Sequence, residues 1–337
     1  MVKNSRSTDQ VSVIITSYNQ RQFLEASLDS IIQQTVGSLP IIVVDDGSTD
    51  GSVEYLARLA EDGKGVTFLR TNRVGVSAAI NFALLGVRTP YVAFLAADDV
   101  ALHSRLELQL NQISDSDEIV AVFGKAEIID EFDNILPQCF SPFNCATVPD
   151  RTVDEQLLRG GNYLCASSAL ISMRAIWDAG PFHVGLQNLQ DYEMWLRLSA
   201  VGKISVLDQT IVQYRMTSNI KQLSGTHNDN RMTAELSWIQ ANSPNPEGWS
   251  FNGDEDSVLA KILNLRAKEN GLFNSRFEFY SALNLLRGVA FSFNQTVNAL
   301  LQIMSEEIDF VGNEGRKNVI LQLQQRWPWN VKLLNLE

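Results

Sequence analysis

Short apolar runs alternate with amphipathic segments along the first hundred residues. The runs are rich in β-branched residues, as in strands buried on both faces of a sheet, and they lie at residues 11–16, 41–44, 66–69 and 91–95. Between them, apolar residues recur with a period of about 3.6, which predicts helices. These lie at 21–34, 52–60 and 77–87. Because strands separated by single helices pair in parallel, we expect an α/β sheet with helices on both faces.

The pattern is less regular beyond residue 100. Helices are predicted at 105–113 and 190–201, and further strands at 119–123, 164–173 and 204–214. The segment 243–249 contains two prolines and a glycine, which cannot continue a helix or a central strand, so it is the best candidate for a linker. Amphipathic helical patterns follow it. We therefore predict a sheet-containing domain at 1–240 and a mainly helical C-terminal region at 241–337.

Composition and charge exclude several classes of protein. Of the 337 residues 45% are apolar and 20% are charged, which is typical of a soluble globular protein with a sizeable core. There are 27 Lys and Arg against 39 Asp and Glu, a net charge of −12, and no cluster of basic residues. Such a surface repels phosphate backbones and anionic lipid, so nucleic acid is not an expected partner.

Cysteine usage and hydropathy indicate the cellular compartment. Cys139, Cys145 and Cys165 are odd in number and match neither a metal-binding spacing nor a disulfide framework, so we expect reduced thiols. The first ten residues lack the apolar core of a secretory signal. No stretch approaches the roughly 20 apolar residues that cross a bilayer. These observations predict a cytoplasmic protein that is not integral to a membrane.

Polar residues follow each of the first four predicted strands. They are found at 16–19, at Asp45 and Asp46, at 71–73, and at Asp98 and Asp99. Each group alone is consistent with a capped turn. The carboxyl ends of parallel strands, however, meet at one edge of the sheet, where ligands bind in this class of fold. The four groups together therefore predict a polar, acidic site at that edge.

Five motifs resemble those of the family 2 glycosyltransferases. In order they are VSVIITSYN at 11–19, VVDDGSTD at 43–50, NRVGVSAAIN at 72–81, FLAADD at 94–99 and QDYEMWLRL at 190–198. Tyr214-Arg215 resembles the family's closing Tyr-Arg. The resemblance covers about residues 11–220. It implies an inverting transferase with the GT-A nucleotide-sugar fold: a mixed, mostly parallel sheet with flanking helices, to which the C-terminal region adds a mainly helical appendage.

The resemblance implies a metal site at Asp98 and Asp99. Sugar transfer from a nucleoside diphosphate requires stabilisation of the charge on the departing diphosphate. A hard cation, Mg²⁺ or Mn²⁺, provides it when one or two carboxylates and the diphosphate oxygens bind the ion. Asp98 matches the last acid of the family's Asp-x-Asp element and is the expected direct ligand, whereas Ala96 replaces the first acid. The alternative is that both acids cap the following helix.

The nucleotide site is expected at the ends of the first three strands. Tyr18 offers a ring for stacking, and Asp45 or Asp46 can accept a hydrogen bond from the imide of uracil or thymine. The sequence leaves the choice between these two acids open. Gly75 permits close approach of the backbone, and Arg73 can reach the ribose or a phosphate. The remaining expected contacts come from Ser17, Asn72 and Asp98.

Asp191 matches the position of the family's general base. It is expected to begin a helix, whose dipole keeps a carboxylate ionised near neutral pH. The preceding residue is Gln190, where the family usually has glutamate. Without that neighbouring charge we expect a weaker base. The alternative is an ordinary helix cap, with Glu193 and Arg197 forming a surface pair. Trp195, on the same helix, is expected in the core.

Two functions from different classes remain open. The first is a metal-dependent inverting transferase that moves a sugar from a UDP- or dTDP-sugar to a hydroxyl of a growing glycan, in polysaccharide or O-antigen assembly. The second is a non-catalytic sugar-nucleotide-binding or scaffold protein that retains the fold. Four departures from the family pattern favour the second: Ile80, Ala96, Gln190 and Thr217. A nicotinamide dehydrogenase is excluded because no GxGxxG follows the first strand.

The C-terminal region lies outside the resemblance. Its apolar stripes predict helices packed on the catalytic domain. Two alternatives are self-association and docking to a lipid-linked acceptor, which would bring the protein to the inner face of the membrane, because large apolar patches seldom stay exposed without a partner.

Overall fold

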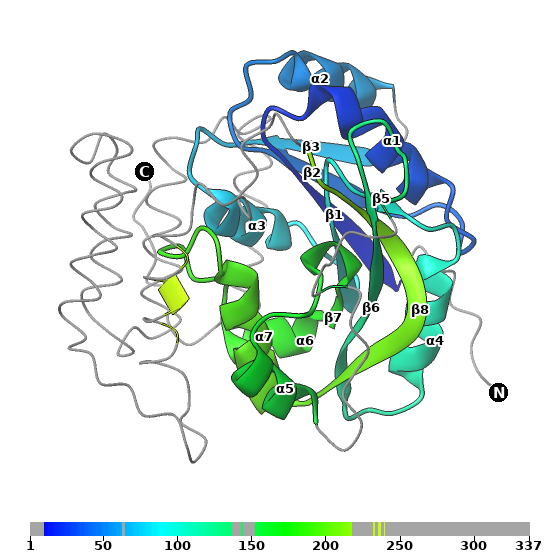
Figure 1. Ribbon diagram of the computed structural model, residues 1–337. Helices are drawn as coiled ribbons and strands as arrows, with labels where there is room; N and C mark the ends of the chain where they lie inside the picture. Colours follow the sequence, from blue (N-terminus) through cyan, green and yellow to red (C-terminus); the bar gives the residue numbers. More distant parts are fainter. Residues whose placement is uncertain are drawn as a thin grey trace.

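A computed structural model describes residues 10–62, 65–136, 143, 152–217, 232, 235–236 and 239 (Figure 1). The predicted C-terminal region, 241–337, lies outside the described residues. The division of the chain at residue 240 therefore stays a prediction.

One mixed sheet of eight strands organises the described residues, in the order β3-β2-β1-β4-β7-β6-β8-β5. β1, β2, β3 and β4 pair in parallel, as do β6 and β8, whereas β7 is antiparallel to both of its neighbours and β5 is antiparallel to β8. The strands span Val11–Ser17 (β1), Ile41–Asp45 (β2), Val66–Arg70 (β3), Tyr91–Ala96 (β4), Val100–Ala101 (β5), Ile119–Ile129 (β6), Leu170–Ser172 (β7) and Lys203–Arg215 (β8).

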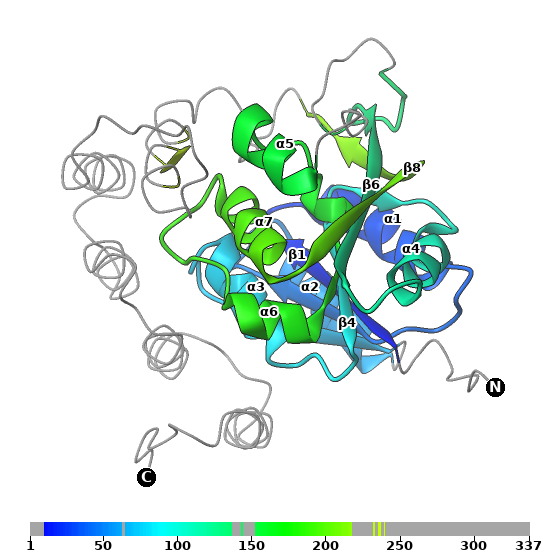
Figure 2. The ribbon, with the colours of Figure 1, turned by 90° about the horizontal axis from the view of Figure 1, so that it is seen from below.

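Helices cover both faces of the sheet because alternate strand residues point to opposite sides. Val13 and Ile15 of β1 share one core with apolar residues of three helices, and Ile14 shares the other core with residues of four helices. The first set is α1 (Arg21–Ile32), α2 (Ser52–Glu61) and α4 (Arg105–Ser114). The second set is α3 (Val76–Leu84), α5 (Val153–Gly160), α6 (Met173–Ala179) and α7 (Gln190–Val201). Figure 2 shows α1 and α4 on one side of the sheet and α3, α6 and α7 on the other.

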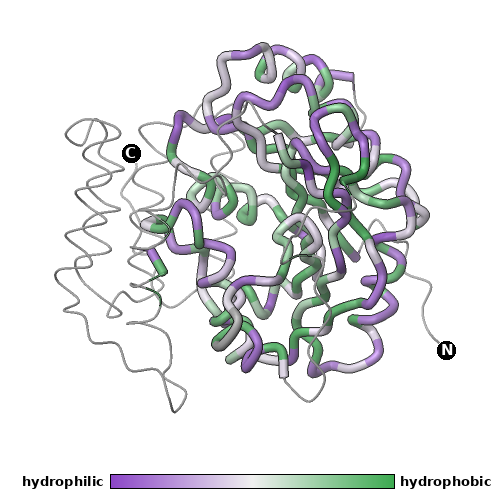
Figure 3. Tube along the Cα trace, in the orientation of Figure 1, coloured by the Kyte–Doolittle hydropathy of each residue, from purple (hydrophilic) through white to green (hydrophobic). Residues whose placement is uncertain are grey.

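Hydrophobic residues follow the central strands, and hydrophilic residues gather in the surrounding loops (Figure 3). All five residues of β2 are buried, as are the middle residues of β4. The apolar runs at 11–16, 41–44 and 91–95 therefore correspond to strands covered on both faces, as predicted, whereas β3, at the edge of the sheet, is only partly buried.

Two predicted strands differ from the observed ones. Of the segment 164–173, only β7 is a strand, because Ala166–Ser168 forms a 3₁₀ turn and Met173 begins α6. The Ser168 amide and hydroxyl both donate to the Cys165 carbonyl oxygen, at 2.9 and 2.8 Å, which stabilises the turn. In contrast, β6 continues past the predicted residue 123 to Ile129, since it pairs with β8 over its length.

β6 and β8 form a long, bent ribbon at one side of the sheet (Figure 1). Their close approach requires a glycine at position 124, where a Cβ atom would lie 2.7 Å from the side chain of Ile211. Bulges interrupt the pairing near this residue. The ribbon ends at Ile129 and Arg215, next to the carboxyl end of β4.

Cys165 is buried and makes no disulfide bond with another described residue. Cys139 and Cys145 lie outside the described residues. Within the part of the chain that the structure describes, no helix combines the length and the apolar character needed to cross a bilayer.

Candidate functional site

Asp45, at the end of β2, joins the loops that follow β1 and β2. Its carboxylate is fully buried and accepts hydrogen bonds from the Ser17 hydroxyl at 2.9 Å and from the amide and hydroxyl of Ser48 at 2.8 and 2.5 Å. The Ser48 hydroxyl in turn accepts from the amide of Asn19 at 2.8 Å. Ser17 and Asp45 thus hold the two strand ends together, and both oxygens of Asp45 are engaged within the protein.

Asp46 is partly exposed at the same edge. Its Oδ1 accepts from the Thr71 hydroxyl at 2.6 Å and the Val74 amide at 2.7 Å, and its Oδ2 accepts from the Gly75 amide at 2.8 Å. Burial of the carboxyl, the largest influence, raises the pKa of Asp46 above its ordinary value. A carboxylate offers about four acceptor positions, so Asp46 retains capacity for a further donor. Both acids accept three hydrogen bonds, and Asp46 is the one of the two with solvent access.

Tyr18 and Arg73 lie together beside this acid. Tyr18 is 42% exposed, and the guanidinium carbon of Arg73 lies 5.5 Å from the centre of its ring. Asn72 and Arg73 are exposed in the loop before α3, and Arg73 has a φ of 55°. Gly47, with a φ of 80°, allows that loop to approach, because a Cβ there would be 3.2 Å from Arg73. The structure therefore places Arg73 beside the exposed ring of Tyr18, and Val74 and Gly75 of the same loop against Asp46.

Asp98 and Asp99 follow β4. Asp99 is buried, and its carboxylate accepts from the Ser167 hydroxyl and from the Arg215 amide, the latter at 2.9 Å. Burial, and then the charge of Asp98, raise the pKa of Asp99 well above its ordinary value. Asp99 does not cap α4, whose N-cap residue is Ser104. Asp98 is 9% exposed and is the more accessible of the two carboxylates.

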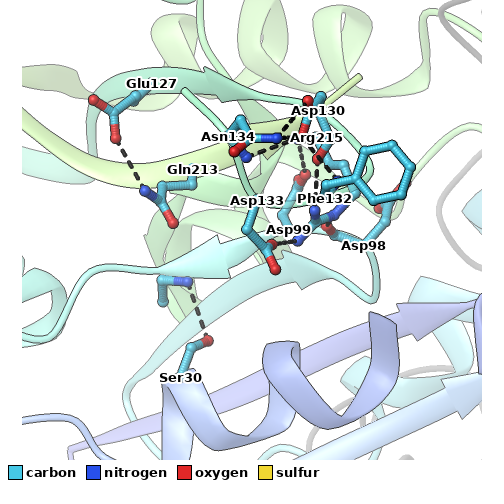
Figure 4. Close-up of polar contacts among 11 residues, drawn as sticks. Ser30, Asp98, Asp99, Glu127, Asp130, Phe132, Asp133, Asn134, Gln213 and Arg215 are labelled. Atoms are coloured by element: carbon cyan, nitrogen blue, oxygen red, sulfur yellow. Dashed lines mark hydrogen bonds and ion pairs between the residues drawn. The ribbon is translucent and has the colours of Figure 1, made fainter. Parts of the chain in front are cut away.

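Arg215 organises the backbone around these acids (Figure 4). Arg215 is only 1% exposed. Its guanidinium donates to the carbonyl oxygens of Asp98 and Asp130 at 2.7 Å each and to the Asp133 carboxylate at 2.6 Å. It also lies 4.5 Å from the ring centre of Phe23. The sequence predicts no role for Arg215 beyond its match to the family's closing Tyr-Arg pair. Its contacts connect β8, the loop after β6 and the end of β4.

Asp191 is the second residue of α7 and is partly exposed. Its Oδ2 accepts from the Asn162 side-chain amide at 3.0 Å, and its Oδ1 accepts from the Tyr192 amide at 2.7 Å. Despite these bonds and the helix start, burial raises the pKa of Asp191 to about 6. At neutral pH the group is mostly ionised, and its affinity for a proton is higher than that of an ordinary aspartate.

The neighbouring Glu193–Arg197 pair is not a surface pair, contrary to the alternative considered from the sequence. Two N–H groups of Arg197 donate to the two carboxylate oxygens of Glu193 at 2.6 and 2.7 Å, and both side chains are largely buried. Arg197 also donates to the carbonyl oxygens of residues 179–181. Trp195 is 1% exposed, which confirms its expected place in the core.

The short segment 162–167 links Asp191 to Asp99. Asn162 donates to Asp191, and Ser167, five residues later, donates to Asp99. Five residues span at most about 18 Å when fully extended. Between them, the Cys165 thiol lies near both carboxylates: burial mainly, and then the charges of Asp99 and Asp191, raise its pKa. The sequence did not single out this segment, because neither a lone Asn nor a lone Ser marks a site.

The donor set around Asp98 suits a cation that a phosphate ligand helps to bind. Among the described residues, no cluster of three or more His, Cys, Asp or Glu side chains could hold a metal alone. Mg²⁺ commonly binds through one or two carboxylates together with substrate phosphate oxygens and water. Asp98, which at 9% exposed is less deeply buried than Asp99, is the carboxylate that fits that arrangement.

Comparison with known proteins identifies the family. Residues 12–179 match the model of the family described as glycosyl transferase family 2, a stretch that contains β1 to β4 and the acids at their ends. The chain belongs to glycosyltransferase family 2. Asp191 lies outside the residues that match the family model, so its assignment depends on the motif at 190–198 and on the geometry described above.

Two of the chain's curated relatives are longer proteins. An uncharacterized glycosyltransferase of Rickettsia felis is 29% identical over 221 residues, which are 62% of this chain and 34% of the relative. A hyaluronan synthase of Pasteurella multocida is 23% identical over 319 residues, which are 90% of this chain and 31% of that protein. The chain thus spans about a third of the length of these relatives.

Solved structures support the fold. S. aureus TarS 1–349 in complex with UDP-GlcNAc superposes with a TM-score of 0.55 at 18% identity, covering 97% of this chain and 95% of that one. Mannosyltransferase PcManGT from Pyrobaculum calidifontis, in complex with GDP-Man and Mn²⁺, superposes with a TM-score of 0.52 at 16% identity. The match covers 95% of this chain and 88% of that one. The predicted GT-A fold, a mixed sheet with flanking helices, is confirmed for the described residues.

Proposed function

We propose that this glycosyltransferase moves a sugar from a nucleoside diphosphate to an acceptor hydroxyl with inversion, and that Asp191 is the general base. The observation that carries the proposal is the segment 162–168, which contacts Asp191 at one end and Asp99 at the other. It joins a proton acceptor to the acidic edge of the sheet. Inverting transfer needs such a pair of centres, one for the acceptor hydroxyl and one for the leaving diphosphate.

The environment of Asp191 suits a base. General bases act best when their pKa is close to the working pH, and burial raises the pKa of Asp191 to about 6. The amide groups of Asn162 and Tyr192 fix the direction of the carboxylate. Direct displacement at the anomeric carbon requires only this proton acceptor and no nucleophile from the enzyme.

The donor site is proposed at the ends of β1 to β3. Asp46 accepts the imide hydrogen of uracil or thymine, the base stacks on Tyr18, and Arg73 contacts the ribose or a phosphate. The exposure of Tyr18, the spare acceptor capacity of Asp46 and the position of Arg73 support this assignment. Asp45, whose oxygens are engaged by Ser17 and Ser48, supports the loop that carries Asp46. The proposed donors are therefore UDP- and dTDP-sugars.

Asp98 is proposed to hold Mg²⁺ or Mn²⁺, with Asp99 as its neighbour. Such a cation neutralises charge on the departing diphosphate. Asp99, anchored by Ser167 and the Arg215 amide, fixes the backbone that presents Asp98. PcManGT was solved with Mn²⁺, which supports a cation in this fold.

The proposed acceptor is a hydroxyl of a growing glycan, free or lipid-linked, in polysaccharide or O-antigen assembly. The likeness to a protein named hyaluronan synthase supports a polysaccharide. The proposed location is the cytoplasm, at the inner face of the membrane where the acceptor is lipid-linked.

The variant D191N tests the role of the base. We expect nucleotide release from a panel of UDP- and dTDP-sugars with Mn²⁺ to fall by roughly 10²–10⁴-fold. The shift in melting temperature caused by the donor should match the wild type, because Asp191 is not part of the proposed donor site. The control is D178N, whose carboxylate pairs only loosely with Arg174 at 3.7 Å on the surface.

D178N should retain wild-type turnover. Wild-type turnover by D191N would contradict the assignment of the base. Donor binding without nucleotide release or transfer by the wild-type chain would favour the alternative of a non-catalytic sugar-nucleotide-binding protein.

A further inference from the structure

Glu235 is a buried acid that the sequence did not single out. The residue is 0% exposed. Its Oε1 accepts from the Gln187 amide, and its Oε2 accepts from the amides of Asn188 and Leu189, each at 2.9 Å. No described Lys, Arg or His lies within ion-pair distance of it. Three consecutive N–H groups of one loop therefore stabilise this carboxylate.

The loop that Glu235 binds leads directly into α7, two residues before Asp191. Its other end is attached to α3, where the Ser77 hydroxyl donates to the Leu186 carbonyl oxygen at 2.9 Å. Ile239, four residues after Glu235, is 1% exposed and belongs to the core that contains Trp195 of α7. Glu235 thus reaches the start of α7 from a segment that is itself anchored in the same core.

The contacts of Glu235 fix both geometry and charge at this helix start. A buried carboxylate is costly unless hydrogen bonds compensate for its lost hydration, so the loop and Glu235 hold each other in one arrangement. The positive end of the α7 dipole adds to the attraction. Because a shift of about 1 Å in a reacting group can lower a rate about 10²-fold, the position of this loop matters for the carboxylate that follows it.

The charge of Glu235 also acts on Asp191. Burial is the main cause of the raised pKa of Asp191, and the charge of Glu235 raises it further. Among the described residues, the groups that face Asp191 include the neutral Asn162, the Tyr192 amide, the Cys165 thiol and Glu235. Glu235 is the one carboxyl group among these.

We propose that Glu235 is a positioning residue for sugar transfer: it binds the backbone of residues 187–189 and thereby fixes the place of Asp191. The inference depends on the proposed function of Asp191. It assigns a role in catalysis to a residue that lies beyond residues 12–179, the stretch that matches the family model.

The variants E235Q and E235A test the proposal. Gln keeps one acceptor oxygen but loses the charge, and Ala loses both. We expect kcat to fall by about 10-fold in E235Q and by about 10²-fold in E235A, with the donor KM unchanged. Since activity requires ionised Asp191, the acidic limb of the kcat/KM profile lies near its pKa of about 6. Loss of the Glu235 charge should move that limb to lower pH in both variants.

Two further measurements need no substrate. Hydrogen exchange at the amides of Gln187, Asn188 and Leu189 should be slow in the full-length wild type and faster in E235A. The pKa of the Asp191 carboxyl, followed by carbon NMR, should be lower in E235Q than in the wild type. The control is E155Q, since Glu155 also accepts from a backbone amide at a helix start but is exposed. E155Q should leave the loop amides, the Asp191 pKa and kcat unchanged.

The outcomes separate the two proposals. Wild-type kcat and an unmoved acidic limb in both Glu235 variants, with an active wild type, would overturn the inference and leave the proposed function intact. Faster amide exchange without a change in kcat or in the Asp191 pKa would reduce Glu235 to a structural residue. No transfer by the wild type would overturn the proposed function, whereas the exchange and NMR results would still decide whether Glu235 positions Asp191.

Discussion

At the scale of single residues, two physical effects oppose each other at Asp191. The start of α7 and the bonds from Asn162 and Tyr192 stabilise its ionised form, whereas burial destabilises that form. Burial is the larger effect, so the pKa rises to about 6. The helix start was predictable from the sequence, but the burial arises from residues far away along the chain. The sequence therefore marks Asp191 as the proposed base but does not predict its raised pKa.

This balance predicts a cost in stability. The pKa of Asp191 in the folded protein is above that in the unfolded chain, so the ionised carboxyl destabilises the fold above pH 6, and this cost disappears as the fold takes up a proton at lower pH. We expect D191N to be more stable than the wild type at pH 7.5 by roughly 1–3 kcal/mol, and by much less at pH 4.5. Urea unfolding at both pH values measures the difference. An equal difference at both pH values would contradict the account.

Asp45 and Asp46 also show a limit to what can be predicted from the sequence alone. The motif predicts an acid for the nucleotide base without choosing between the two neighbours. Each carboxylate accepts three hydrogen bonds, from Ser17 and Ser48 at Asp45 and from Thr71, Val74 and Gly75 at Asp46. The choice therefore depends on burial, because Asp45 is 0% exposed and Asp46 is partly exposed. Because Ser17, Thr71 and the residues of the loop after β3 are far from the two acids in sequence, only the fold decides between the two.

At the scale of elements, the strands and helices of the first hundred residues were predictable because each is an uninterrupted apolar run or a regular amphipathic period. The 3₁₀ turn at Ala166–Ser168 was not, since the bonds that stabilise it involve serine hydroxyls within an otherwise strand-like run. That turn matters for the site because it presents Ser167 to Asp99. The junction between β8, β6 and β4 likewise depends on one side chain, Arg215.

The variant R215M tests this junction. In the wild type, the Arg215 guanidinium donates to two carbonyl oxygens and one carboxylate. Methionine at this position leaves those acceptors without their donor. We expect a loss of roughly 2–4 kcal/mol in the free energy of unfolding. The control is R174M, because the 91% exposed Arg174 side chain forms a loose pair and should contribute less than about 1 kcal/mol. Equal stability of R215M and R174M would contradict this role.

At the scale of the whole molecule, the sheet brings residues from positions 17 to 215 to one edge. Three of the four parallel strands supply Ser17, Asp45, Asp46 and the acids after β4, and α7 supplies Asp191 from the other half of the described fold. The sequence predicts this convergence for the parallel strands because their carboxyl ends must share an edge. It could not predict how the second half returns to that edge, because β7 reverses direction and the β6–β8 ribbon bends around it.

The central claim is that the acidic edge binds a nucleoside diphosphate together with a divalent cation, and calorimetry tests it most directly. Titration of UDP and dTDP into the full chain, with and without Mn²⁺, should show binding that the cation strengthens by about tenfold or more. In D98N that gain should disappear, while D178N should retain it. If the wild type binds neither nucleotide, or binds both equally well without Mn²⁺, the account is contradicted.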